Sequence, residues 1–267
     1  VLAERGEQIS EITGAARVMR EMAASIKAPS NAVDCCGTGG DHSGTYNIST
    51  AVALVAAACG VPIAKHGNRA ASSQSGAADV LEALGVNLNL EQEELETALD
   101  KFCFCFLMAP RHHQAMKHVV SVRKELGFRT IFNLLGPLAN PASTQYQLIG
   151  VFDEKWLEPM AQTLKNLGTK HAWIVHGDDG LDEITTTTET QCVILDEGTI
   201  SRKTLTPNDF DLPKASLNDL KGGDATENAQ ALRHLLEGQH SAYRDIVLAN
   251  SAAVLMIHGT ALSLKDG

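Results

Sequence analysis

Short apolar runs alternate with stretches of helical periodicity along most of this chain. Residues 7–25 place apolar side chains at near-helical spacing, and Pro29 stops the pattern, which predicts an opening helix. The strands predicted after it are 33–36, 61–64, 104–109, 147–152 and 172–176, and the helices are 50–58, 77–84, 91–102, 114–126, 155–167, 227–236 and 243–258. Strands and helices in alternation indicate an α/β fold with a largely parallel central sheet flanked by helices.

Two stretches depart from this alternation. Residues 190–206 contain β-branched runs on either side of Asp196-Glu197-Gly198, which predicts a local antiparallel hairpin. The dipeptides Gly136-Pro137 and Asn140-Pro141 are typical of loops, and we expect loops at both places.

Glycines follow the first predicted strand at residues 37–41, which read Gly-Thr-Gly-Gly-Asp. Glycine allows backbone N–H groups to approach a ligand closely, and residues 47–50 then open a helix whose N-terminus attracts anions. Asp41 adds a carboxylate for a ribose hydroxyl or a metal-bound water, and Thr45 adds a hydroxyl. The segment predicts a phosphate site, which we call the first cradle; a glycine-rich turn without a ligand is the alternative.

Residues 65–73, Lys-His-Gly-Asn-Arg-Ala-Ala-Ser-Ser, follow the second predicted strand and form what we call the second cradle. This loop has more hydrogen-bond donors than a connection requires, although a solvated connection is the alternative. Both cradles lie after a strand and before a helix. Since ligands of open α/β sheets bind at the carboxyl ends of the strands, we expect both cradles to face one ligand.

Asp182 and Glu183 lie beyond the predicted strand 172–176 and the loop 177–180. Adjacent carboxylates are usually a solvated surface feature. At the edge that holds two phosphate cradles, however, they suit Mg²⁺, which takes oxygen ligands and bridges to substrate phosphates.

Arg123 and the pair His112-His113 lie in or near the predicted helix 114–126. Adjacent histidines on a helix face different directions and have no zinc partner at a suitable spacing, so we interpret them as polar lining. The planar guanidinium of Arg123 could orient an acidic co-substrate, and a salt bridge on the helix surface is the ordinary alternative.

The composition limits the classes of function. The chain has 267 residues, a net charge of −10 and 4% aromatic residues, so it can bury a large core in one or two domains but offers nucleic acid neither a basic patch nor stacking platforms. We find no apolar stretch long enough for a membrane span and no export signal. Six cysteines without a C-x-x-C pair favour a reduced, cytoplasmic setting.

Taken together, the two cradles, the Asp182-Glu183 pair and the stretch 129–138, Arg-Thr-Ile-Phe-Asn-Leu-Leu-Gly-Pro-Leu, closely resemble the anthranilate phosphoribosyltransferase family. The match is ordered and covers nearly the whole chain. It implies a homodimeric enzyme of tryptophan biosynthesis, with a small all-helical domain joined to a large α/β domain. The implied reaction transfers phosphoribose from phosphoribosyl pyrophosphate (PRPP) to the amine of anthranilate with Mg²⁺.

The resemblance also implies roles for individual residues. The PRPP site would contain Gly37, Gly40, Asp41, Thr45, Asn47, Ile48, Ser49, Thr50, Lys65, His66, Gly67, Asn68, Arg69, Ala70, Ala71, Ser72, Ser73 and Ala77. Two Mg²⁺ ions would be held by Ser49, Asp182 and Glu183. Anthranilate would contact Gly37, Asn68 and Arg123, with His66, His113 and Pro137 as further lining. No general base is assigned, because an aryl amine is neutral at pH 7.

The same resemblance divides the chain. Residues 1–29 would be part of the small helical domain, which we expect to be truncated here, and residues 110–128 would pack with it. The α/β domain would comprise residues 30–109, with both cradles, and residues 129–267. A pyrimidine nucleoside phosphorylase and a non-enzymatic, nucleic-acid-binding relative of this fold are the alternatives. The Asp182-Glu183 pair favours the transferase over the first, and the net charge of −10 argues against the second.

Overall fold

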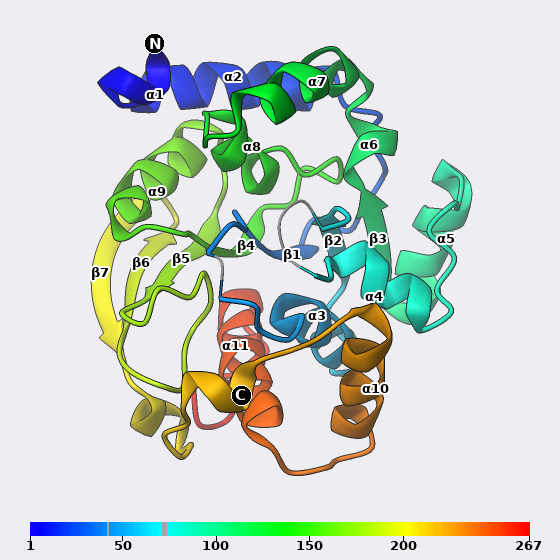
Figure 1. The fold of residues 1–267 in the computed structure, drawn as a ribbon, viewed down its shortest axis with the longest axis vertical. Helices are drawn as coiled ribbons and strands as arrows, with labels where there is room; N and C mark the ends of the chain where they lie inside the picture. Colours follow the sequence, from blue (N-terminus) through cyan, green and yellow to red (C-terminus); the bar gives the residue numbers. More distant parts are fainter. Residues whose placement is uncertain (42, 71–73) are drawn as a thin grey trace.

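The computed structural model describes residues 1–41, 43–70 and 74–267, without the side chains of residues 120, 121, 123 and 124. Within this part of the chain the strands form one seven-stranded sheet in the order β3-β2-β1-β4-β5-β6-β7 (Figure 1). The strands are β1 (Val33–Gly37), β2 (Ile63–Gly67), β3 (Phe104–Met108), β4 (Tyr146–Gly150), β5 (His171–Gly177), β6 (Thr190–Asp196) and β7 (Thr199–Leu205). Strands β1 to β5 are parallel, which confirms the predicted α/β fold.

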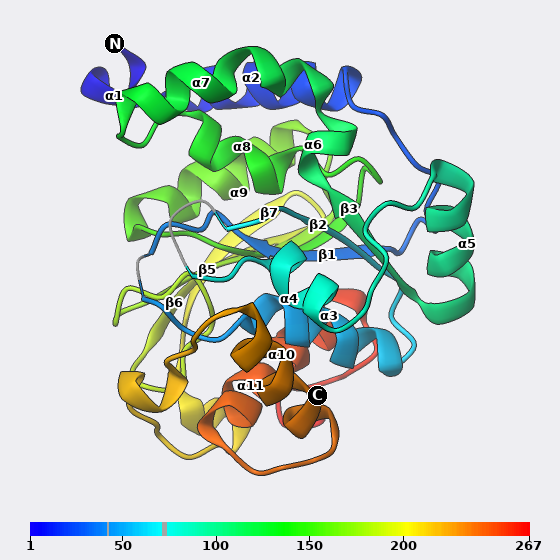
Figure 2. The same ribbon diagram turned by 45° about the vertical axis from the view of Figure 1, so that its right-hand side comes forward.

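Helices cover both faces of the sheet (Figures 1 and 2). The helices are α1 (Leu2–Arg5), α2 (Ile9–Glu21), α3 (Ile48–Ala58), α4 (Ala77–Ala83), α5 (Gln92–Phe102), α6 (Ala109–His112), α7 (Lys117–Leu126), α8 (Phe132–Leu138), α9 (Leu157–Asn166), α10 (Ala225–Leu236) and α11 (Ala242–His258). The core on one face is built with α3, α10 and α11, and the core on the other with α2, α8 and α9. Helix α5 packs along β3.

The alternation of side chains along β5 shows why this central strand is apolar on both of its faces. Trp173 and Val175 enter the core that contains α3 and α11, whereas Ala172 and Ile174 enter the core that contains α9. Because successive side chains of a strand point to opposite faces, a strand buried on both faces favours apolar residues on both sides.

The predicted hairpin is confirmed, and it belongs to the main sheet. Strands β6 and β7 pair antiparallel, with Glu197 and Gly198 both at positive φ in the two-residue turn between them. Such turns match the twist of a hairpin. Strand β6 also pairs antiparallel with β5, so the hairpin extends the central sheet at one edge.

The prediction of a loop at Gly136-Pro137 was wrong, because both residues lie in α8. This short helix buries Leu134, Leu135 and Leu138 in the core, and it ends one residue after Pro137. Tertiary packing therefore outweighs the local preference of the Gly-Pro dipeptide. The loop predicted at Asn140-Pro141 is present.

The segment that follows α2 is joined to α6. The Ala24 N–H donates to the carbonyl oxygen of His112 at 2.9 Å, and Nδ1 of His112 lies 2.6 Å from the carbonyl oxygen of Ala24. Both views place α7 beside α2 (Figures 1 and 2). The domain boundaries at residues 29, 109 and 128 stay a prediction.

Among the residues described, none of the helices combines the length and the apolar character that a membrane crossing requires.

Candidate active site

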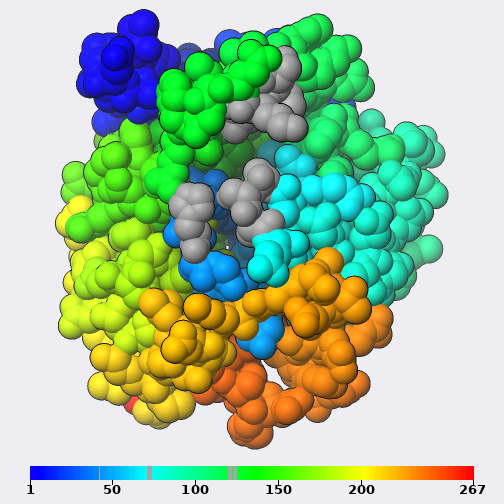
Figure 3. Space-filling model, viewed as in Figure 1, coloured from blue at the N-terminus to red at the C-terminus, as the bar shows by residue number. Residues whose placement is uncertain are grey.

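The predicted site segments emerge at one edge of the sheet. Strands β1, β2, β4 and β5 run in the same direction, and Gly37 at the end of β1 pairs with Gly150 at the end of β4. The first cradle follows β1, the second follows β2, and the Asp182-Glu183 pair follows β5. In the space-filling view the blue segments around the first cradle occupy the centre of the face, between green segments above and orange segments below (Figure 3).

Asp182 lies directly on the ends of β1 and β4. The Gly39 N–H donates to Oδ2 of Asp182 at 2.8 Å. A Cβ on Gly37 would come within 2.2 Å of that oxygen, and a Cβ on Gly150 would come within 1.5 Å of the Asp182 carbonyl oxygen. Glycine at 37 was predicted to admit a ligand, and the structure shows that it also admits a carboxylate of the protein itself.

Three carboxylates gather at this position. Burial, followed by the neighbouring charge of Asp41, raises the pKa of Asp182. Burial and then Asp182 raise the pKa of Glu183 well above its usual range, while the charge of Lys65 acts in the opposite direction. The site therefore brings together carboxyl groups whose ionised forms are destabilised by burial and by one another, at the meeting point of the first cradle and residues 182–183.

Lys65 is a buried cation at the base of both cradles. Its side chain is 1% exposed, and its Nζ donates to the Cys35 carbonyl oxygen at 2.6 Å and to the Ser49 Oγ at 3.2 Å. The carboxylate of Asp34, which is fully buried, accepts the His66 N–H at 3.1 Å. Burial raises the pKa of Asp34, and the charge of Lys65 lowers it. Lys65 thus fixes the Ser49 hydroxyl and compensates buried acids.

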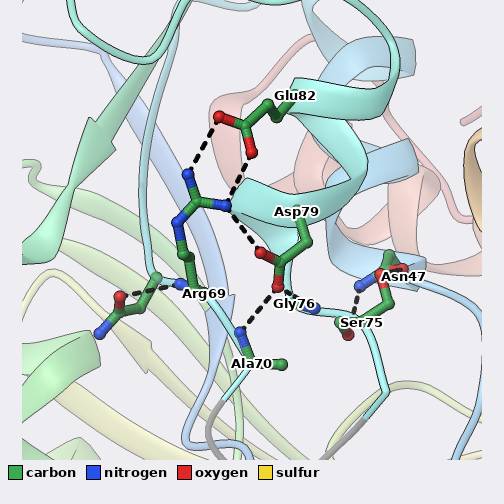
Figure 4. Close-up of polar contacts among 8 residues, drawn as sticks. Asn47, Arg69, Ala70, Ser75, Gly76, Asp79 and Glu82 are labelled. Carbon is green, nitrogen blue, oxygen red and sulfur yellow. Dashed lines mark hydrogen bonds and ion pairs between the residues drawn. The ribbon is translucent and has the colours of Figure 1, made fainter. Parts of the chain in front are cut away.

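Asn47, at the position before α3, connects the first cradle to Ser75, in the segment between the second cradle and α4 (Figure 4). Its Nδ2 donates to the Ser75 carbonyl oxygen at 3.1 Å, and its Oδ1 accepts the Ser75 hydroxyl at 3.3 Å. The side chains of Ile48 and Thr50 are buried. Thr45 forms an isolated antiparallel bridge with Lys221.

Arg69 is held by α4 rather than by the first cradle. Its guanidinium forms ion pairs with Asp79 at 2.9 Å and Glu82 at 2.8 Å (Figure 4). The second oxygen of Asp79 accepts the N–H groups of Ala70 and Gly76, each at 2.9 Å, so one carboxylate joins both ends of the loop.

Of the other residues of the second cradle, the structure describes some and leaves the last three out. The Asn68 carbonyl oxygen accepts the Ala78 N–H at 3.2 Å, near the start of α4 at Ala77. A Cβ on Gly67 would come within 2.7 Å of the Phe106 ring. Ala71, Ser72 and Ser73 lie outside the described residues.

The predicted anthranilate residues His66, His113 and Pro137 come together. The rings of His66 and His113 have centroids 5.1 Å apart, and Nδ1 of His66 lies 3.0 Å from the carbonyl oxygen of Gly136, the neighbour of Pro137. In the described part of the chain, Nε2 of both rings is buried without a hydrogen-bond partner. The backbone of Arg123 belongs to α7, but its side chain is outside the described residues.

His66 gives this cluster an expected pH dependence. Burial, and then the neighbouring His113, lower the pKa of His66 to about 3, whereas an unfolded histidine titrates near 6.5. Between these values the unfolded chain binds a proton that the folded chain does not, so the free energy of unfolding falls as the pH falls. One such proton corresponds to about 1.4 kcal/mol per pH unit.

We expect the variant His66→Gln to lose less stability than the unsubstituted protein between pH 6.5 and pH 4.5, as measured by urea denaturation. The exposed His240→Gln is the matched control and should follow the unsubstituted protein. Parallel stability curves for His66→Gln and the unsubstituted protein would contradict this assignment.

Arg129 is a site residue to which the sequence assigned no role. Its Nη2 donates to the Gly40 carbonyl oxygen, and its guanidinium lies 4.1 Å from the centroid of the Phe152 ring. Arg129 therefore fixes the first cradle from the loop before α8. Its only signal in the sequence was its place in the stretch 129–138.

Known proteins resemble this chain in sequence and in fold. The model of the glycosyl transferase family, a/b domain, matches residues 29–267. The anthranilate phosphoribosyltransferase of Rhodospirillum rubrum is 57% identical over 263 residues, which are 98% of this chain and 76% of that protein. The crystal structure of the enzyme from Thermus thermophilus has a TM-score of 0.94 at 45% identity and covers 99% of this chain and 79% of its own.

A structure of the Saccharomyces cerevisiae enzyme in complex with PRPP and Mg has a TM-score of 0.88 at 29% identity, over 97% of this chain and 73% of its own. The relatives thus match this chain over nearly its whole length, in sequence and in fold. The chain belongs to the anthranilate phosphoribosyltransferase family.

Proposed function

We propose that this chain transfers 5-phosphoribose from PRPP to the amine of anthranilate and releases pyrophosphate, the second step of tryptophan biosynthesis. The observation that carries the proposal is the contact of Asp182 with the first cradle at Gly39, at the edge where Lys65 joins that cradle to the second. A polyphosphate and its cations would find their ligands at this edge.

The PRPP site would use backbone N–H groups more than charged side chains. The first cradle offers Gly37, Gly40 and the N-terminus of α3, which favours a phosphate because the positive end of the helix dipole lies there. The remaining proposed contacts are those of Asp41, Thr45, Asn47, Ile48, Ser49, Thr50, Lys65, His66, Gly67, Asn68, Arg69, Ala70, Ala71, Ser72, Ser73 and Ala77.

Two Mg²⁺ ions would be held by Ser49, Asp182 and Glu183, together with substrate oxygens. The donor set fits, because it consists of hard oxygen atoms whose carboxylates are destabilised by burial and by each other. Among the described residues, no three or more His, Cys, Asp or Glu side chains are arranged to hold a metal ion. When bound, Mg²⁺ neutralises the charge that develops on the leaving pyrophosphate.

Anthranilate would lie against Gly37, Asn68, Arg123, His66, His113 and Pro137. Burial keeps His66 neutral at physiological pH, so its ring provides polar lining without repelling Arg123. The planar fork of Arg123 would orient the anthranilate carboxylate. The amine is neutral at pH 7 and needs no base before it attacks. Positioning of the two substrates by this rim would supply most of the rate increase.

The purified protein is expected to consume anthranilate only when PRPP and Mg²⁺ are both present. The decay of anthranilate fluorescence measures this, with single omissions and EDTA as controls.

Arg123→Ala should mainly raise the KM for anthranilate, whereas Asp182→Asn and Glu183→Gln should mainly lower Mg²⁺-dependent turnover. Equal, small effects of all three substitutions would count against the roles proposed for Arg123, Asp182 and Glu183. No turnover by the unsubstituted protein would count against the proposed phosphoribosyl transfer. The homodimer and the cytoplasmic location stay predictions.

A further inference from the structure

A distant segment supports the loop between the first cradle and α3. The Tyr46 N–H donates to the Leu220 carbonyl oxygen at 3.0 Å, and the Gly222 N–H donates to the Gly44 carbonyl oxygen at 3.0 Å. Thr45 and Lys221 form the antiparallel bridge between them. Residues 220–223, which we call the strap, therefore hold residues 44–46 by main-chain hydrogen bonds.

Asn228, in the first turns of α10, extends this support to the start of α3. Its side chain is 2% exposed, its Oδ1 accepts the Gly223 N–H at 2.8 Å, and its Nδ2 donates to Oδ1 of Asn47 at 2.9 Å. A Cβ on Gly222 would come within 2.7 Å of the Asn228 Oδ1, so the strap can approach Asn228 only with glycine at this position.

The hydrogen bonds of Asn47 leave its side chain a single orientation. Its Oδ1 accepts from both Asn228 and Ser75, and its Nδ2 donates to the Ser75 carbonyl oxygen. An amide oxygen has two lone pairs and an amide nitrogen has two hydrogens, so both acceptor sites and one donor are occupied. One N–H of Asn47 is left over from these contacts to meet a ligand. A flipped amide would lose the hydrogen bonds to Asn228 and to the Ser75 carbonyl oxygen, because it would set donor against donor and acceptor against acceptor.

Tyr243 of α11 holds the backbone of the same residue. Its hydroxyl donates to the Asn47 carbonyl oxygen at 3.2 Å, and its ring stacks on Tyr46 with centroids 4.4 Å apart. The residue before α3 is thus fixed on its side chain by α10 and on its main chain by α11.

We propose that Asn228 is a positioning residue for PRPP, which acts through Asn47 on the first cradle and the N-terminus of α3, with Tyr243 as its main-chain counterpart. The inference rests on the proposed function. The reason is preorganisation: N–H groups stabilise a polyanion best when their geometry is fixed before it binds. Asn228 itself contacts no substrate in this assignment.

Steady-state kinetics test the proposal. Asn228→Ala is expected to raise the KM for PRPP about tenfold, which corresponds to the loss of roughly one buried hydrogen bond, and to leave the KM for anthranilate within about twofold. Tyr243→Phe keeps the ring stacked on Tyr46 and should raise the same KM less. Gln230→Ala, an exposed position of α10, is the matched control and should change neither constant.

A double-mutant cycle separates positioning from general damage. In an Asn47→Ala background, Asn228→Ala should have no further effect on the KM for PRPP, because its route to the ligand is already removed. An equal rise in both KM values, or a KM for PRPP that matches Gln230→Ala, would overturn the proposal. If Asn228→Ala does not fold, Tyr243→Phe decides by the same criterion.

Calorimetric binding of pyrophosphate with Mg²⁺ keeps this inference separate from the proposed function. If the unsubstituted protein binds pyrophosphate but does not consume anthranilate, the proposed function is refuted and the positioning role of Asn228 is not. That role is then judged by the affinity for pyrophosphate. A roughly tenfold weaker affinity in Asn228→Ala than in Gln230→Ala supports positioning, and equal affinities overturn it.

Discussion

Replacing Gly150 by alanine is expected to abolish turnover and to lower the free energy of unfolding by about 3 kcal/mol. The new Cβ would lie 1.5 Å from the carbonyl oxygen of Asp182 and 2.4 Å from its carbonyl carbon, so the backbone itself must move. Leu181 and Ile184 on either side are buried, and the Ile184 N–H donates to Asn250 at 2.9 Å. The segment cannot withdraw without losing these contacts.

Gly37→Ala provides an instructive comparison. Its Cβ would meet the side chain of Asp182, at 2.2 Å from Oδ2, and a side chain can rotate away. We therefore expect a smaller loss of stability but a similar loss of turnover, because the carboxylate leaves the cradle.

The control for both is Gly14→Ala in α2, where a Cβ would have no neighbour within 4 Å and where alanine favours the helix. Urea denaturation gives the stability, and anthranilate fluorescence gives the turnover. Normal turnover and stability in Gly150→Ala would show that residues 181–184 are not held against β4 as described.

Replacing Lys65 by methionine is expected to lower the free energy of unfolding at pH 8 by about 3–5 kcal/mol, the usual cost of leaving a buried charge uncompensated. The variant would leave Asp34 buried without its compensating cation, and the Ser49 hydroxyl without its donor. Turnover should fall as well, since Ser49 is a proposed Mg²⁺ ligand.

The sign of the pH dependence follows from Asp34. Its pKa is raised in the folded protein, so the folded chain binds more protons there than the unfolded chain, and stability decreases as the pH rises. Without the lysine charge this effect becomes larger. The deficit of Lys65→Met should therefore shrink when denaturation is repeated at pH 5. Lys101→Met, exposed on α5, is the control, and a deficit equal to that of the control at both pH values would contradict the prediction.

Local pattern predicted most of the fold. The strand–helix alternation gave the parallel sheet, and the residue types after β1 and β2 indicated two anion-binding loops at its carboxyl edge. The local pattern gave a wrong prediction at α8, where a Gly-Pro pair is part of a helix because three leucines are buried. It also did not predict α6, a single turn that follows directly on β3.

Contacts between distant segments account for most of what the sequence could not predict at the site. A glycine indicates that something approaches closely but does not say what, and at Gly37 the neighbour proved to be Asp182. Likewise, nothing in the composition of α10 indicates that Asn228 meets Asn47, because the two residues are 181 positions apart. Pairings of this kind depend on the topology of the whole sheet.

The distance of 181 positions between Asn47 and Asn228 also sets an order of events on the ribosome. At typical rates of protein synthesis, roughly 10–40 s pass between the appearance of the one residue and the other. Throughout this interval the nascent chain already contains the glycine-rich loop but has no α10 to fasten it. The start of α3 is therefore completed only once α10 has been made, long after its own sequence.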